Sequence, residues 1–270
     1  MSHTIVSCYY LLPNNKKRSI PDYMVWISNF LTFCHSPIVM FSDGEIADAM
    51  DTLRKTAFPD SNNWLLIRRP LDKLSFNSPE HLDYFNQVAR NEKHVGITAD
   101  VFRIWANKAF LTEEISAKNP FNTSSFVWCD AGCWRNEKIA QQYGPGWPRK
   151  QLSALSITWM DDSLRHVRKI PCPETLEECV KVYSPVILNM SSMAGAIFGG
   201  SHECIKTLCC VFVKVLDICI KENIYVGTDQ QIFAFSALWL ESRMPVDFYD
   251  KYRQPVPEGT DEWFLFQTVL

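Results

Sequence analysis

The sequence lacks several patterns that would have assigned it to a large enzyme class. It has no Gly-rich P-loop, no GxSxG and no GxGxxG segment, which argues against a P-loop NTPase, an α/β-hydrolase and a dinucleotide-binding enzyme. No CxxC pair occurs among its ten cysteines, and its six histidines form neither an HxH nor an HExxH pattern, which argues against a zinc site. No uninterrupted apolar run approaches the ~20 residues that a membrane-spanning helix needs.

An excess of positive charge is also absent. The formal net charge is −3, and the longest basic run is Lys16, Lys17 and Arg18, so we expect no nucleic-acid partner. The first ten residues, MSHTIVSCYY, lack the basic and apolar regions of a signal peptide. We therefore expect a cytoplasmic protein with reduced thiols and no transmembrane segment. Peripheral association with a membrane surface stays open.

Short, continuous apolar segments alternate with segments of helical periodicity along most of the chain. The predicted strands are Thr4 to Tyr10, Ile38 to Phe41, Trp64 to Ile67, Phe126 to Cys129, Leu155 to Trp159, Ala194 to Phe198 and Trp263 to Phe266. The main predicted helices are Pro21 to Phe33, Glu45 to Phe58, Asp100 to Lys118, His202 to Glu222 and Asp229 to Glu241. This alternation predicts an α/β fold: a mostly parallel sheet with helices on both faces, in a single domain spanning residues 1–270.

Ligands of open α/β sheets bind at the carboxyl ends of the strands. Four segments end predicted strands: Ser7 to Tyr10, Ser42-Asp43, Asp130-Ala131-Gly132 and Gly199-Gly200. Asp130 is the sharpest candidate, because a carboxylate there can ligate Mg²⁺ or Mn²⁺ and so neutralise a diphosphate. The alternative is an Asp that only caps the next turn. The pair Gly199-Gly200 would let a ligand approach the backbone, or would simply form a tight turn.

Two helices carry further polar candidates. On the Asp100 to Lys118 helix, Arg103 shares a face with Asp100 and could bind a phosphate or ribose, or could form a solvated ion pair. Lys108 lies off this face and ranks below Arg103. Asp229 suits a helix start after Thr228, yet the carboxylate and the two amides that follow it could also grip sugar hydroxyls or stabilise charge at an anomeric centre.

The segments TIVSCYY, IVMFSD, FRIWANKAFL, FVWCDAGCWR, YGPGWP, IFGG and GTDQQIFA, in this order and spacing, resemble the HtrL/YibB-like family, a group similar to GT-A glycosyltransferases. The resemblance runs from Thr4 to about Phe266. It implies a GT-A-like, Rossmann-type fold that binds a nucleotide-diphosphate sugar. Asp130 would then stand in the place of the metal-binding Asp-x-Asp motif, with Gly132 replacing the second Asp, and would hold Mn²⁺ or Mg²⁺.

The resemblance and the residue patterns together predict a glycosyltransferase that moves a sugar from a nucleotide-diphosphate sugar, expected to be a UDP-sugar, to a hydroxyl of a carbohydrate or glycoconjugate. Catalysis is assigned to Asp229 and Gln230, with Asp229 acting as a base or as a stabiliser of charge. The nucleotide-sugar pocket is assigned to Ser7, Tyr9, Tyr10, Asp43, Arg103, Lys108, Asp130 and Gly132. The acceptor and sugar pocket is assigned to Trp134, Phe198, Gly199, Gly200 and Gln231.

Two alternatives remain open. The missing second Asp also fits a GT-A-like module that binds a nucleotide sugar or glycan without turnover. A nucleotidyltransferase ranks last, because it needs a Gly-rich basic loop and the loop after Tyr10 contains no glycine.

Overall fold

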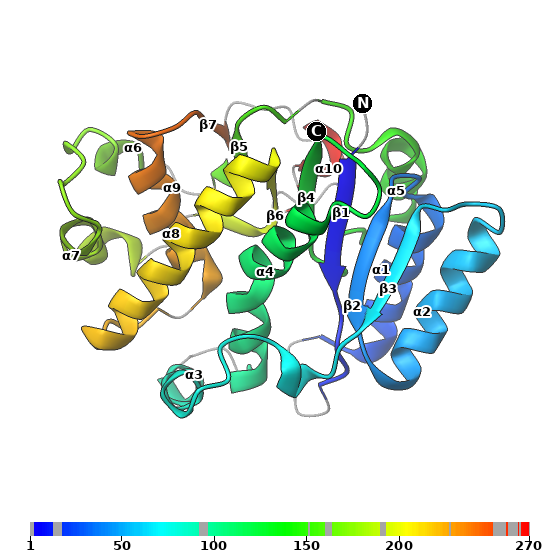
Figure 1. Ribbon diagram of the computed structural model, residues 1–270, viewed down its shortest axis with the longest axis horizontal. Helices are drawn as coiled ribbons and strands as arrows, with labels where there is room; N and C mark the ends of the chain where they lie inside the picture. Colours follow the sequence, from blue (N-terminus) through cyan, green and yellow to red (C-terminus); the bar gives the residue numbers. More distant parts are fainter. Residues whose placement is uncertain are drawn as a thin grey trace.

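The computed structural model describes residues 3–12, 18–91, 97–150, 152–159, 164–189, 193–226, 228–250, 258, 264 and 266–269. Its centre is one sheet of seven strands in the order β3-β2-β1-β4-β6-β5-β7 (Figure 1). The strands are β1 His3–Cys8, β2 Ile38–Ser42, β3 Trp64–Arg68, β4 Ser125–Cys129, β5 Leu155–Trp159, β6 Met193–Gly200 and β7 Val246–Asp250. Four of the six pairings are parallel, and the two pairings of β6, with β4 and β5, are antiparallel.

Helices cover both faces of this sheet. They are α1 Ile20–Phe33, α2 Gly44–Ala57, α3 Pro79–Asn91, α4 Ala99–Lys118, α5 Glu137–Tyr143, α6 Leu164–Val167, α7 Leu176–Ile187, α8 His202–Lys221, α9 Asp229–Glu241 and α10 Phe266–Val269, with single 3₁₀ turns at Leu71–Lys73 and Gly144–Gly146. One core packs α3, α4, α7, α8 and α9 against one face, and a second packs α1, α2 and α5 against the other. The mostly parallel α/β fold predicted from the sequence is confirmed.

In β1, β2 and β4, alternate residues belong to the first and the second core. Val6 of β1 belongs to the first core and Ile5 to the second, and both are fully buried. Strands buried on both faces need apolar residues at every position, which explains why the segments read as unbroken apolar runs. Helix starts follow local chemistry: Ser19 accepts a hydrogen bond from the amide of Asp22 and Pro21 occupies the first turn of α1.

The order of the strands creates a switch point beside β1. From β1 the chain proceeds outward through β2 to β3, and then returns through α4 to place β4 on the other side of β1. The strands β1, β2 and β4 run parallel, so their carboxyl ends share one edge of the sheet. In open α/β sheets the crevice at such a switch point is where ligands bind.

Two strand predictions are corrected by the structure. Because β6 runs antiparallel to β4, Gly199 and Gly200 pair with Val127 and Phe126, at the edge opposite to Asp130. The C-terminal strand predicted at Trp263 to Phe266 is wrong where the structure describes it: Phe264 lies in a 3₁₀ turn and Phe266 begins α10. Strand β7 was not predicted, since the sequence VDFYD reads as neither an apolar run nor a clear helix.

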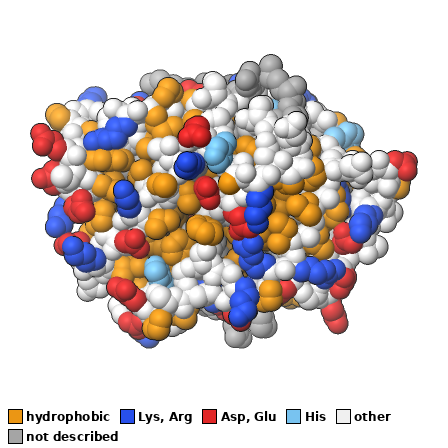
Figure 2. Space-filling model, viewed as in Figure 1, with side chains coloured by type: hydrophobic (Ala, Val, Ile, Leu, Met, Phe, Trp, Pro, Cys, Tyr) orange, Lys and Arg blue, Asp and Glu red, His pale blue; other side chains and the backbone are white. Residues whose placement is uncertain are grey.

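The surface carries charges of both signs. In Figure 2, Lys and Arg side chains lie beside Asp and Glu side chains over the face shown, without a broad basic area. Among the described residues, no helix is both long enough and apolar enough to span a bilayer.

Candidate active site

A pocket opens at the carboxyl ends of β1 and β4, at the switch point of the sheet. It encloses about 850 Å³, part of which is open to solvent. Its lining combines both strand ends with one face of α4, the start of α1 and the segment after β4: Cys8, Tyr9, Tyr10, Leu12, Arg18, Ile20, Tyr23, Val101, Ile104, Trp105, Lys108, Trp128, Asp130, Ala131, Gly132, Arg135 and Phe264. The pocket therefore stands where the fold class places a ligand.

The walls of the pocket are rich in aromatic rings. Tyr9 and Tyr23 pack with ring centroids 5.2 Å apart, and Trp105 and Trp128 add indole rings from α4 and β4. Flat rings of this kind can stack on a planar heterocycle such as a nucleobase.

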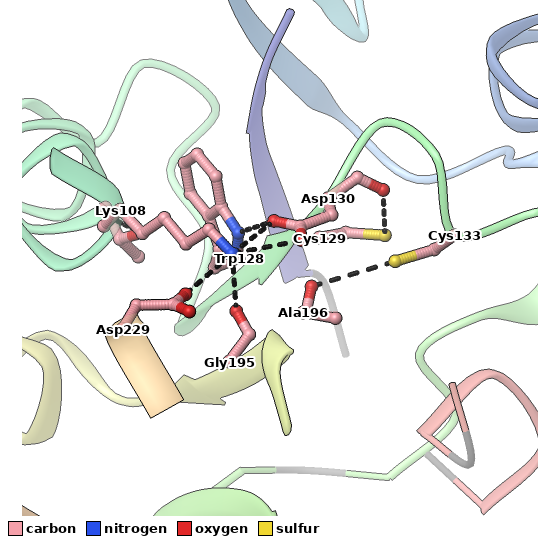
Figure 3. Close-up of polar contacts among 9 residues, drawn as sticks. Lys108, Trp128, Cys129, Asp130, Cys133, Gly195, Ala196 and Asp229 are labelled. Carbon is pink, nitrogen blue, oxygen red and sulfur yellow. Dashed lines mark hydrogen bonds and ion pairs between the residues drawn. The ribbon is translucent and has the colours of Figure 1, made fainter. Parts of the chain in front are cut away.

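A buried lysine links the two carboxylates that the sequence singled out (Figure 3). The Nζ atom of Lys108 lies 2.9 Å from Oδ1 of Asp130 and 2.8 Å from Oδ2 of Asp229. It also donates to Asp130 Oδ2 at 3.0 Å and to the carbonyl oxygen of Gly195 at 3.1 Å. Both carboxylates therefore contact one ammonium, but only Asp130 belongs to the described lining of this pocket, whereas Asp229 lines a different one.

Burial and charge oppose each other in this cluster. Burial lowers the pKa of Lys108, but Asp130 and Asp229 raise it by more, so the lysine stays an ammonium. Burial raises the pKa of Asp130, the Lys108 ammonium opposes that rise and the Asp229 carboxylate adds to it, leaving a net upward shift. Asp130 remains accessible to a ligand, with 32% of its side chain exposed, whereas the Lys108 side chain is only 3% exposed.

The residues of this cluster come from four elements of the fold. Asp130 directly follows β4, Lys108 lies on the buried face of α4, and Asp229 is the first residue of α9. Gly195 stands near the start of β6, which reaches the same edge because β6 is antiparallel to β4. A side chain at Gly195 would collide with the Asp229 carboxylate, since a Cβ there would lie 2.5 Å from Oδ2.

Trp128 fixes the orientation of the Asp130 carboxylate. Its indole Nε1 donates a 2.6 Å hydrogen bond to Asp130 Oδ1, and its ring stacks at an interplanar angle of 14° on Phe198 in the core. A rigid donor anchored in this way restricts the rotation of the carboxylate about its own side-chain bonds.

Replacing Trp128 with Phe tests this orientation, because the ring contact is kept while the donor is lost. We expect an unfolding free energy lower by about 1.5 kcal/mol, the lower value for a hydrogen bond to a charged group, since Lys108 still contacts both oxygens. The matched control is Trp134→Phe: Trp134 Nε1 is buried without a hydrogen-bond partner among the described residues. Denaturant unfolding of both variants measures the difference, and equal losses would contradict the role given to Trp128.

The described residues do not fit a divalent cation on Asp130. Both oxygens of Asp130 face the Lys108 ammonium, and Oδ1 also accepts from Trp128. Mg²⁺ and Mn²⁺ need several oxygen ligands, yet among the described residues no group of three His, Cys, Asp or Glu side chains is arranged so that it could hold a metal ion. The metal expected from the resemblance remains a prediction that the local geometry does not favour.

The structure brings five of the eight residues predicted for the nucleotide-sugar pocket to its wall, namely Tyr9, Tyr10, Lys108, Asp130 and Gly132. Lys108 is more central than Arg103, contrary to the ranking from sequence. Arg103 donates to Asn77 at 2.9 Å and to Asp100 at 2.6 Å, outside the pocket lining.

Ser7 and Asp43, the other two residues predicted for the nucleotide-sugar pocket, are not part of its described lining. Ser7 is completely buried inside β1, and Asp43 is the residue that precedes α2.

The predicted acceptor pocket is corrected. Phe198 and Trp134 are buried in the two separate cores, at 0% and 1% exposure. At Gly199 and Gly200 a Cβ would meet atoms of Leu152 and Cys204 at 2.8 Å, so these glycines serve packing inside the sheet and not the approach of a ligand.

The amides after Asp229 do not face the described pocket either. Gln231 accepts a 3.0 Å hydrogen bond from the amide of Thr228 and so closes the first turn of α9. Gln230 is partly buried and does not line the pocket in the part of the chain that the structure describes.

Sequence reasoning missed several residues of the site. Gly195 carried a signal, because a glycine inside an apolar strand often marks a close approach of another group. Trp128 was assigned to a buried strand without a role for its N–H. Arg18, Tyr23, Trp105 and Arg135 come from segments whose convergence depends on the packing of α1 and α4, which residue patterns do not reveal.

Comparisons with known proteins do not assign this chain to a family. No family model and no curated protein matches the chain, so the resemblance to the HtrL/YibB-like family remains a prediction. Among solved structures, the chain is similar to mouse xyloside xylosyltransferase 1 in its apo form, with 10% sequence identity, 93% of this chain and 85% of that chain covered, and a TM-score of 0.41. A likeness at this level does not carry the activity of that enzyme over to this chain.

Proposed function

We propose that the protein is a glycosyltransferase that uses a nucleotide-diphosphate sugar, with the pocket beside β1 and β4 as its donor site. The observation that supports this most is the position of the pocket at the switch point of the sheet, with aromatic walls and with Lys108 and Asp130 in its lining. Lys108 also pairs with the buried Asp229. The aromatic rings suit a nucleobase, and the carboxylate of Asp130 suits the hydroxyls of a ribose or sugar.

The proposed reaction is a substitution at the anomeric carbon of the donor. The bond from that carbon to the diphosphate oxygen breaks, the acceptor oxygen bonds to the carbon, and the acceptor's proton passes to the released diphosphate or to water. We assign Asp229 the role of a charge stabiliser and not that of a base, because its side chain is only 5% exposed and pairs with Lys108. A UDP-sugar donor and a glycan acceptor are the first choices for the assay.

A second candidate follows from the same cluster. Both of its carboxylates are ion-paired with Lys108, so neither stands ready as a base for an acceptor hydroxyl. That arrangement also suits a protein that binds a nucleotide sugar without turning it over.

Turnover separates the two candidates. A panel of nucleotide sugars with simple acceptor glycans, read out as released nucleotide diphosphate, should identify a donor, and Asp130→Asn should then lower the rate by about 100-fold. Asp48→Asn is the control, because Asp48 is exposed on α2 and pairs with Arg68. Binding of a donor without release would favour the second candidate, and an unchanged rate in Asp130→Asn would remove Asp130 from the chemistry.

A further inference from the structure

The ammonium of Lys108 is surrounded by oxygens of the protein: it donates to Asp130 Oδ2 and to the carbonyl oxygen of Gly195, and it lies at ion-pair distance from Asp130 Oδ1 and Asp229 Oδ2. An ammonium carries three N–H donors, and four oxygens of Asp130, Asp229 and Gly195 lie within 3.1 Å of it. Lys108 therefore holds the two carboxylates in place and does not itself grip the phosphates of a nucleotide.

Lys108 and a divalent cation would compete for the same carboxylate oxygens of Asp130. A divalent cation bound to Asp130 would share the oxygens that Lys108 contacts at 2.9 and 3.0 Å, so two cations would repel each other in a buried place. The cluster itself, one ammonium against two carboxylates, has an excess of negative charge. A diphosphate placed beside it needs positive groups from elsewhere in the pocket.

Two guanidinium groups of the pocket supply that charge. Arg135 follows β4, and its guanidinium carbon lies 4.6 Å from the ring centroids of both Trp26 and Phe264. Its Nε donates to the carbonyl oxygen of Gly132 at 3.4 Å. Arg18, which precedes α1 by two residues, lines the same pocket. Guanidinium groups recognise phosphate through pairs of parallel hydrogen bonds, and a group packed on aromatic rings is already oriented for this.

We infer that Arg18 and Arg135 bind the diphosphate of the donor, without a divalent cation on Asp130. The inference rests on the proposed function and specifies its chemistry. Asp130 then accepts hydrogen bonds from ligand hydroxyls, and the leaving diphosphate is stabilised by protein cations.

Equilibrium binding tests this without any turnover. Calorimetric titration with UDP, GDP, ADP and inorganic pyrophosphate is carried out on the full chain, once in EDTA and once in Mn²⁺. We expect the tightest nucleotide to bind with the same Kd in both buffers, and Arg135→Ala to weaken it by about 10- to 100-fold, as for a charged hydrogen bond. Arg18→Ala should weaken it in the same direction.

The controls keep the test decisive. Arg149→Ala removes a guanidinium that lies over the Tyr143 ring outside the pocket, and it should leave Kd unchanged. Should Arg135→Ala fail to fold, Arg135→Lys keeps the charge but loses the paired hydrogen bonds, and weaker binding is still expected. Nucleotide binding that requires Mn²⁺ would overturn the inference while supporting a donor site. Absence of nucleotide binding in both buffers would overturn the proposed function and the inference with it.

Discussion

Replacing Lys108 with Met should lower the free energy of unfolding by about 3–5 kcal/mol, because removing one partner of a buried ion pair leaves uncompensated charge behind. Two carboxylates would then face each other without the ammonium that now lies 2.9 Å from one and 2.8 Å from the other. Nucleotide binding should be lost as well, since the carboxylate of Asp130 would no longer be held at the pocket. Denaturant unfolding and calorimetric titration measure the two effects.

The decrease in unfolding free energy caused by Lys108→Met should also depend on pH. Asp130 already has a raised pKa, and loss of the lysine that opposes this rise should move the pKa further up. A carboxyl whose pKa is higher in the folded than in the unfolded state stabilises the fold at low pH, and this contribution is lost as the pH rises through the folded pKa. The deficit of the variant relative to the native chain should therefore be smaller at about pH 5 than at about pH 8.

Lys118→Met is the matched control on the same helix. The Lys118 side chain is 61% exposed and pairs with Glu114 at 2.7 Å. The substitution should therefore lower the free energy of unfolding by no more than about 1 kcal/mol, and this decrease should not depend on the protonation of Asp130. Similar losses in the two variants would mean that the Lys108 cluster contributes no more than a surface pair.

The fold was largely predictable because burial on both faces of a parallel sheet requires unbroken apolar strands. β1, β2 and β4 are buried throughout and appear where the sequence predicts them. β3 is also found where it was predicted, but it lies at the edge of the sheet and is only partly buried. The direction of β6 was not predictable, because an apolar run pairs equally well in either direction. The resulting error placed Gly199 and Gly200 at the wrong edge of the sheet.

The site was predictable only as far as it depends on strand ends. Asp130 was found because it follows β4 directly, and Asp229 because it begins a helix. The sequence analysis ranked Lys108 below Arg103, because helical periodicity places Lys108 among apolar residues and does not show which residue it contacts. Its long side chain reaches the sheet edge, and only the packing of α4 against β4 and α9 reveals the two carboxylates that make its burial tolerable.

Gly195→Ala should disturb the site without removing a charged group. A Cβ at Gly195 would lie 2.5 Å from Oδ2 and 3.0 Å from Cγ of Asp229, and 3.1 Å from Cδ2 of the buried Phe233 ring. Since the Asp229 carboxylate is held by Lys108, it has little freedom to yield. We expect a loss of about 3 kcal/mol in unfolding free energy, at the upper end for overpacking. A displacement of reacting groups on the order of 1 Å should also lower turnover by roughly 100-fold.

Gly146→Ala separates this collision from the general effect of replacing a glycine. Its added Cβ would meet only the flexible side chain of Arg149, at 3.3 Å, so stability and turnover should stay near those of the native chain. A Gly195→Ala variant that loses stability but keeps its turnover would show that the position of Asp229 is structural and not catalytic. A loss of both, with Gly146→Ala unaffected, would tie the chemistry to the narrow space that β6 leaves for the Asp229–Lys108 pair.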